Sequence, residues 1–295
     1  MEVRDLGALL LLGALWGASF LFIEVAVPVL GPVLLVDLRV LLAAGALVLC
    51  AVAVGSLPAL RARWKEFLFL GGLNAAAPFT LIATSQLNLT ASLAAILNST
   101  TPLFGAVVAA VWIGEALTVR KAVGLLLGVA GVAVLVGLDP VPLSGVVLLA
   151  VGASLLAALC YALGGVYAKR TFSGVSPLGM GIGQQAGATV ILLPPAVATL
   201  PGELPSLAVV LSVLGLALLS TALAYLLYFR LITSVGPTKT LTVTFLVPVF
   251  GVLFGVLLLE EPVSVGTFIG MGTILSSVGL VTGVRFRSAK EKGRA

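Results

Sequence analysis

The chain has 295 residues, of which 60% are apolar and only 9% are charged. Soluble domains carry about 25% Asp, Glu, Lys and Arg, so this composition excludes a soluble globular protein and indicates an integral membrane protein. Histidine is absent, which excludes catalytic triads and metal sites that are built on imidazole. The net charge of +5 is not a nucleic-acid signal, because the cations follow the membrane topology.

Ten apolar stretches approach the length of about 20 residues that crosses a bilayer as a helix. Backbone groups must be hydrogen-bonded within lipid, and these stretches lack the alternation of barrel strands, so we expect helices. The sequence therefore predicts an all-α polytopic membrane protein with ten transmembrane helices. They cover residues 6–27, 32–54, 67–86, 91–112, 119–137, 143–167, 177–193, 208–229, 239–259 and 263–284.

Lys and Arg residues predict the orientation of these helices, because they accumulate on the cytoplasmic side of a membrane. With the N-terminus in the cytoplasm, 15 of the 16 Lys and Arg residues fall on cytoplasmic segments, and Arg39 is the exception. The acidic residues Asp139, Glu203, Glu260 and Glu261 then fall on external loops. We therefore expect both termini, including the basic C-terminal tail, to be cytoplasmic.

The sequence contains an internal repeat with an offset of 146 residues. This offset aligns residues 102–105 (PLFG) with 248–251 (PVFG), and Glu115 with Glu261. It also aligns Gly124 with Gly270, and this pairing predicts close helix packing at both glycines. We expect one five-helix repeat over residues 1–140 and a second, with the basic tail, over 141–295. Because five is odd, the two repeats have inverted orientations, which is typical of secondary transporters with a binding site between the halves.

Motifs along nearly the whole chain resemble those of the drug/metabolite transporter superfamily, in particular its EamA-type ten-helix exporters. The matching residues are Leu15-Trp16-Gly17-Ala18-Ser19-Phe20, Pro32, Arg39, Thr101-Pro102-Leu103-Phe104, Gly114-Glu115, Gly124, Gly128-Val129-Ala130-Gly131, Val247-Pro248-Val249-Phe250 and Glu260-Glu261-Pro262. The resemblance implies a multi-pass transporter of a prokaryotic inner membrane that exports small metabolites, often amino acids or their relatives. The chain departs from the pattern at Glu24, where many relatives have a basic residue.

Three prolines inside predicted helices are candidate hinges, because a proline removes a backbone hydrogen bond and frees the carbonyl four residues earlier. They are Pro78, Pro102 and Pro248. A polar side chain occupies each position four residues earlier, at Asn74, Asn98 and Thr244. These side chains either bind a polar solute beside the broken backbone or only repair the kinks and hydrogen-bond between helices.

Four aromatic residues are further candidates for substrate binding: Trp16, Phe79, Tyr161 and Tyr225. The repeat pairs Trp16 with Tyr161, at an offset of 145, and Phe79 with Tyr225. Their rings offer a platform for apolar or cationic solutes, and buried indole and phenol groups need a hydrogen-bond partner. Core packing is the alternative role for each of them.

Glu24, Asp37 and Arg39 are intramembrane charges near the external ends of the first two predicted helices. Ionisable groups at this depth need partners. We expect Glu24 or Asp37 to pair with Arg39, either as an external gate or as a structural bridge. Proton binding by one of the carboxylates is the alternative.

These features predict a secondary transporter that exports small amphipathic metabolites, amino acids in the first place, by alternating access through a pocket between the repeats. A polyanionic substrate is disfavoured, because no Lys or Arg is expected near the midplane. The expected partners are a small-molecule substrate and the lipid bilayer, without nucleic acid, and the pattern leaves monomer and homodimer open.

Other functions make different demands on the sequence. Efflux of drugs or quaternary cations, with or without proton coupling, needs a pocket carboxylate, for which Glu24 is the candidate. An intramembrane enzyme needs a set of reactive side chains within the membrane, which the sequence lacks, so we expect no catalytic residues, no metal and no cofactor. A scaffold or a lipid scramblase would not need inverted repeats with paired kinks. No GxxxxGK[ST] motif is present, which excludes direct ATP drive by this chain.

Overall fold

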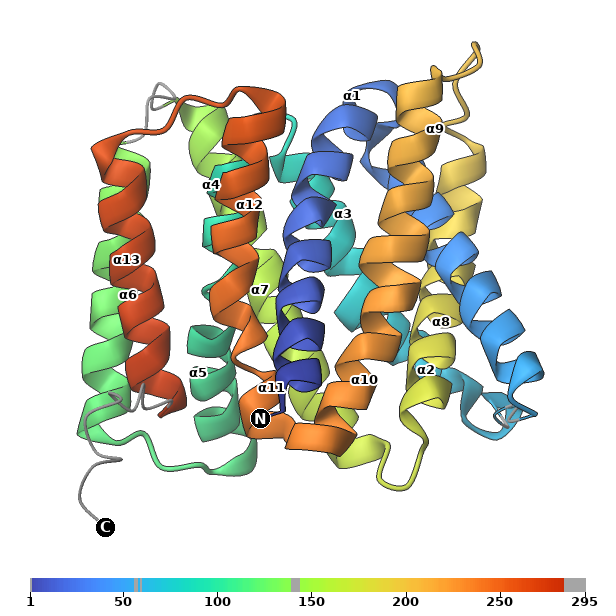
Figure 1. The fold of residues 1–295 in the computed structure, drawn as a ribbon, viewed down its shortest axis with the longest axis horizontal. Coiled ribbons are helices and arrows are strands. Elements are labelled where there is room, and N and C mark those ends of the chain that lie inside the picture. The colour runs from blue at the N-terminus through green and yellow to red at the C-terminus, as the bar shows by residue number, and fades with distance from the viewer. Residues whose placement is uncertain (1, 56–57, 59, 139–143, 284–295) are drawn as a thin grey trace.

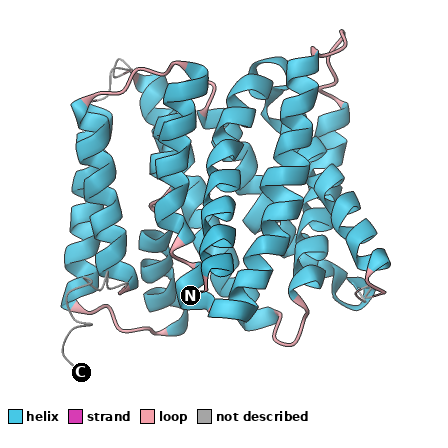
Figure 2. Cartoon of the chain, in the orientation of Figure 1, coloured by secondary structure: helices cyan, strands magenta, loops and turns pink. Residues whose placement is uncertain are grey.

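The computed structural model describes residues 2–55, 58, 60–138 and 144–283, and every regular element in these ranges is a helix (Figure 2). Asp139 and the predicted basic tail lie outside the described residues. In chain order the elements are α1 (Val3–Ala53), η1 (Leu60–Arg63), α2 (Trp64–Gly71), η2 (Gly72–Ala76), α3 (Ala77–Ser85), α4 (Ala91–Asn98), α5 (Thr101–Ile113), α6 (Val119–Gly137), α7 (Gly145–Thr171), α8 (Pro177–Val197), α9 (Leu207–Leu214), η3 (Gly215–Leu223), α10 (Ala224–Val235), α11 (Pro237–Thr240), α12 (Val243–Leu259) and α13 (Val265–Thr282).

Helix α1 contains the first two membrane passes. Its 51 residues would measure about 76 Å if straight, far more than the about 30 Å of a bilayer core. The helix folds back at Gly31, whose φ of 71° and ψ of 162° are accessible to glycine. Figure 1 shows one arm rising from the end where the chain starts, here called the lower face, and the other descending from the opposite, upper face.

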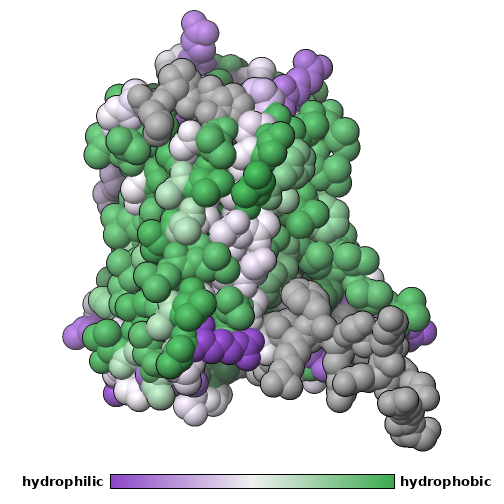
Figure 3. Space-filling view, turned by 90° about the vertical axis from the view of Figure 1, so that its left-hand side faces the viewer, coloured by the Kyte–Doolittle hydropathy of each residue, from purple (hydrophilic) through white to green (hydrophobic). Residues whose placement is uncertain are grey.

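The remaining helices complete ten passes. Seven helical stretches are long and apolar enough to cross a membrane, and α1 counts once among them although it crosses twice. The 21-residue α8 and the 17-residue α12 run through the bundle beside them (Figure 1) and bring the described residues to ten passes, as predicted. On the face shown in Figure 3, apolar side chains form a belt between the polar ends of the molecule, as a bilayer requires.

The two repeats share local structure at the predicted offset of 146 residues. The caps after α5 and α12, Gly114 and Glu260, are both left-handed, with φ of 69° and 55°. The π-helical segments η2 and η3 also overlap under this offset. The turn between α5 and α6 lies at the lower face and that between α12 and α13 at the upper face (Figure 1). The prediction of two inverted five-helix repeats is therefore confirmed.

The glycine pairing also appears in the structure, where α6 packs against α13. A Cβ added at Gly124 would lie 2.7 Å from Cγ2 of Val281, and one at Gly270 would lie 2.7 Å from Cβ of Leu135. These distances are shorter than van der Waals contact. Glycine therefore permits the close approach of these two helices.

The fourth helices of the two repeats break at different points. In the first repeat α4 ends at Asn98 and α5 begins at Thr101, so that Pro102 lies in the first turn of α5. In the second repeat the break precedes α12 at Val243, and Pro248 lies inside that helix. Pro102 thus directly follows the break in the fourth pass, at a first-turn position where a proline costs no hydrogen bond. The repeats adopt different conformations at the same sequence position.

Candidate functional site

A chain of hydrogen bonds joins the two repeats in the middle of the bundle. Asn74 lies in η2, where the π-helical backbone interrupts the third pass, and such interruptions are frequent at functional sites. Its Nδ2 donates to Oε1 of Gln184 in α8 at 2.7 Å. Nε2 of Gln184 donates in turn to the hydroxyl of Tyr225 in α10 at 2.6 Å. Three polar side chains from the third, seventh and eighth passes are thereby held in one arrangement.

Arg39 lies next to this chain and is 6% exposed. Its Nε donates to Oγ1 of Thr221 at 2.9 Å, and the guanidinium carbon lies 3.6 Å from the centre of the Phe79 ring. Thr221 is the central residue of the pass Leu207–Val235. The expectation that no cation approaches the midplane is therefore wrong. Tyr161 and Tyr225 are also within range of the charge of Arg39.

Aromatic rings surround the polar residues and come from symmetry-related pairs of passes. The ring centres of Trp16 and Tyr228 are 5.5 Å apart, between the first and eighth passes. Those of Phe79 and Tyr161 are 6.1 Å apart, between the third and sixth passes. Except for Phe79, these aromatic side chains keep accessible surface, although they lie within the bundle.

The predicted external gate is wrong in its pairing. Glu24 accepts a hydrogen bond from Nε2 of Gln86 at 3.0 Å, and the same nitrogen donates to the carbonyl of Phe20 at 2.9 Å. Asp37 is 2% exposed, and its Oδ1 has no partner among the described residues. Within the described residues, neither carboxylate forms an ion pair with Arg39. The pairing was predicted from the similar depth of these residues in the first two passes. Depth does not determine which side of a helix a side chain projects from, so it could not identify the partners.

The other hinge candidates have mostly structural contacts. The hydroxyl of Thr244 donates to the carbonyl of Leu241 at 2.8 Å, so it is bound to its own backbone. The carbonyl of Asn98 accepts from Oγ1 of Thr101 at 2.8 Å, whereas its Oδ1 is buried without a partner among the described residues. Pro78 lies in the first turn of α3, directly after η2. Asn74 thus joins the central chain, whereas Asn98 and Thr244 do not.

A carboxylate closes the upper face by capping the short helix α4. Glu261 accepts hydrogen bonds from the backbone N–H groups of Ala91, at 2.6 Å, and Ser92, at 3.0 Å, and from the Ser92 hydroxyl. Its repeat mate Glu115 instead forms an ion pair with Lys121, at 3.1 Å, at the lower face. The two equivalent carboxylates therefore have different roles in this conformation.

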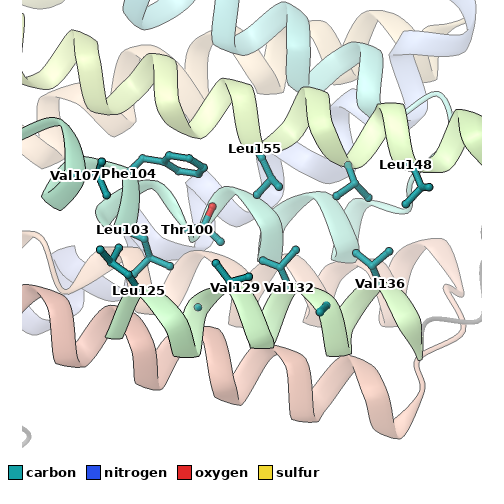
Figure 4. A pocket seen from close by; sticks show the side chains of 13 residues that line it. Thr100, Leu103, Phe104, Val107, Leu125, Val129, Val132, Val136, Leu148 and Leu155 are labelled. Carbon is teal, nitrogen blue, oxygen red and sulfur yellow. The ribbon is translucent and has the colours of Figure 1, made fainter. Parts of the chain in front are cut away.

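An apolar groove lies elsewhere, between α5, α6 and α7 (Figure 4). It has a volume of about 500 Å³, and Thr100 is the one polar side chain among the 13 residues that line it. Because polar solutes need convergent polar groups, the central cluster is a better candidate for a polar-solute site than this groove.

Comparison with known proteins identifies the family. Residues 6–137 and 146–283 match the EamA-like transporter family. The chain belongs to this family. The EamA-like match covers both repeats, and it confirms the resemblance inferred from the motifs.

Individual relatives agree with this family assignment. An uncharacterized transporter of Bacillus subtilis, YvbV, is 30% identical over 277 residues, which cover 90% of this chain and 88% of the relative. The uncharacterized inner membrane transporter YedA of Escherichia coli K12 is 29% identical over an alignment that covers 94% of this chain and 90% of the relative. A solved crystal structure matches with a TM-score of 0.68 over 96% of this chain and 97% of the other. Its 19% identity shows the fold alone. The protein is thus a multi-pass membrane transporter.

Sequence reasoning missed two central residues, Gln184 and Thr221. Adjacent amides at Gln184 and Gln185 within an apolar pass were a usable signal, because buried amides need partners. Thr221 has no such signal. Its importance comes from its contact with Arg39, which is far away in the sequence.

Proposed function

We propose that this transporter exports small amphipathic metabolites, amino acids in the first place, by alternating access through the central cluster. The observation that carries the proposal is the hydrogen-bond chain from Asn74 through Gln184 to Tyr225, which draws its members from both repeats. A solute bound there lies between the two units that move in this class of transporter. We propose no catalytic activity, and the relatives are named as transporters.

The conformation supports an alternating mechanism. At the upper face, Gln86 contacts Glu24, and the Ser154 hydroxyl donates to Ser85 at 2.8 Å. The Ser154–Ser85 hydrogen bond and the Glu261 cap on α4 join the two repeats there, whereas Gln86 and Glu24 belong to the same repeat. The described conformation is thus closed at the upper face. Rocking of the repeats would release these contacts.

We propose that the lower face is cytoplasmic, in an inner membrane. The starts of α2 and α6 and the end of α7 lie at this face (Figure 1). These segments contain Lys65, Arg120, Lys121, Lys169 and Arg170. Such cation enrichment marks the cytoplasmic side. A solute entering from below would meet the aromatic and amide groups first and leave when the upper face opens.

The chemistry of the cluster supports an amphipathic solute. The amides of Asn74 and Gln184 bind polar groups, and the rings of Trp16 and Tyr161 pack against an apolar side chain. Drug-cation efflux through Glu24 is disfavoured, because Glu24 is bound by Gln86 and the central charge is that of Arg39. Transport should accordingly persist in Glu24→Gln.

Counterflow in proteoliposomes tests this function. Vesicles loaded with unlabelled amino acids are mixed with single labelled amino acids, with and without a pH gradient. We expect saturable exchange that is independent of the gradient. Gln184→Leu should raise the KM about tenfold, because it removes two partly buried hydrogen bonds.

The adjacent variant Gln185→Leu is the matched control. Gln185 is fully buried, and its side-chain oxygen and nitrogen have no partner among the described residues. Its replacement should leave the KM unchanged. Failure of the folded wild-type protein to exchange any amino acid would contradict the proposal. An equal effect of the two variants would contradict the assignment of the site.

A further inference from the structure

Arg39 has donors that the protein does not use. A guanidinium group carries five N–H donors, and only Nε of Arg39 forms a hydrogen bond within the described residues. Its terminal nitrogens, Nη1 and Nη2, have no hydrogen-bond partner there, and neither is sealed from solvent. The side chain as a whole is nevertheless more than nine-tenths buried. Arg39 therefore presents a free pair of donors inside the bundle.

The charge of Arg39 is also uncompensated. No described carboxylate lies within ion-pair distance of it, and Glu24 and Asp37 have the other environments given above. The Phe79 ring stabilises the cation from one side, at 3.6 Å. Thr221 fixes the direction of the group, because its hydroxyl donates to the Leu216 carbonyl and can only accept from Arg39. A buried cation without a counterion favours an anionic ligand.

We propose that Nη1 and Nη2 of Arg39 bind the carboxylate of the transported solute. Arginine matches a carboxylate with two parallel hydrogen bonds, which a lysine ammonium cannot reproduce. Phe79 and Tyr161 then lie next to the apolar part of the same molecule. The inference rests on the proposed transport function and narrows its substrates to amphipathic monocarboxylates.

Four compounds with the same branched apolar body test the proposal on the full-length protein. They are L-leucine, its amide L-leucinamide, the amine isoamylamine and the carboxylic acid isocaproate. Thermal stabilisation in detergent measures binding, and counterflow measures transport. We expect leucine and isocaproate to stabilise the protein and to be exchanged, and we expect the two compounds without a carboxylate to be inactive. Binding and exchange of leucine but not of isocaproate would show that the ammonium group is also required, and this result would still support the carboxylate site.

Variants of Arg39 identify the residue responsible. Arg39→Lys keeps the charge and loses the paired donors, so the KM for leucine should rise roughly 10- to 100-fold. Arg39→Gln should abolish the preference for leucine over leucinamide. Arg230→Gln removes an exposed arginine from α10 and should change neither property. If Arg39→Gln does not fold, Arg39→Lys and the wild-type compound series decide the question.

The outcomes separate this inference from the proposed function. Equal binding and exchange of leucinamide or isoamylamine would overturn the carboxylate site and leave transport standing. Stabilisation by leucine and isocaproate without any exchange would contradict the proposed transport but would still support the carboxylate site. Unchanged selectivity in both Arg39 variants would overturn the assignment to this residue.

Discussion

Replacement of Glu261 by glutamine should open the upper face. In the closed conformation its carboxylate accepts hydrogen bonds from two backbone N–H groups, of Ala91 and Ser92, and from the Ser92 hydroxyl. Glutamine has one carbonyl oxygen, so one of these donors loses its acceptor. A hydrogen bond to a charged group contributes about 1.5–3 kcal/mol, and a carboxylate at a helix N-terminus adds about 0.3–1 kcal/mol. A loss of about 2 kcal/mol shifts the ratio of open to closed molecules ~30-fold.

A cysteine at Ser154 reports this opening, because Ser154 is 1% exposed and hydrogen-bonded to the upper end of α3. The reporter is placed in a background in which Cys50 and Cys160 are replaced by alanine. Its maleimide labelling rate in nanodiscs, where both faces are accessible, should rise about 30-fold with Glu261→Gln, in proportion to the open population.

The repeat supplies a matched control for this experiment. Glu115→Gln changes the equivalent carboxylate, which contacts Lys121 at the lower face. It should leave labelling unchanged, because an exposed ion pair contributes little. The reasoning is refuted if Glu261→Gln labels at the wild-type rate or if the two variants accelerate labelling equally.

Three further substitutions have definite expected outcomes. Gly71→Ala should lower the free energy of unfolding in detergent by about 3 kcal/mol, because the added Cβ would overlap the backbone nitrogen of Ala188. Gly45→Ala has open space around it and should raise the free energy of unfolding by about 0.5–1 kcal/mol. Glu260→Gly should stabilise by about 1 kcal/mol, because it removes a side chain from a left-handed backbone, and Glu260→Ala should give no such gain. Tyr225→Phe should raise the amino-acid KM severalfold in counterflow, since it removes the hydroxyl that accepts from the Gln184 amide.

The architecture followed from the sequence because the bilayer leaves few alternatives. Apolar stretches of bilayer length must form helices, and the motif offset shared by Glu115 and Glu261 was enough to predict the inverted repeats. The lack of a loop between the first two passes was also visible as a gap of four residues between the predicted helices. The only information needed was hydropathy and a repeated spacing.

The contacts of the site could not be predicted in the same way. Arg39 was matched with the nearest carboxylates in the sequence, but its hydrogen bond goes to Thr221, 182 residues away. Which residue a charge meets depends on how helices are rotated about their axes, and hydropathy does not report this. The π-helical segments shift that rotation within a single pass, so the position of Asn74 was beyond pattern analysis. Asn74 was a candidate because of Pro78, a reason unrelated to its bond with Gln184.

The fold at Gly31 also bears on how the protein enters the membrane. Since a single residue reverses the chain, no hydrophilic loop has to be carried across the bilayer between the first two passes. The two arms of α1 can therefore enter the bilayer together as a helical hairpin. With the lower face cytoplasmic, as proposed above, insertion machinery would then meet its first substantial polar segment after Ala53, on the side where synthesis takes place. Biogenesis of the first repeat thus requires no translocated segment before the third pass has emerged.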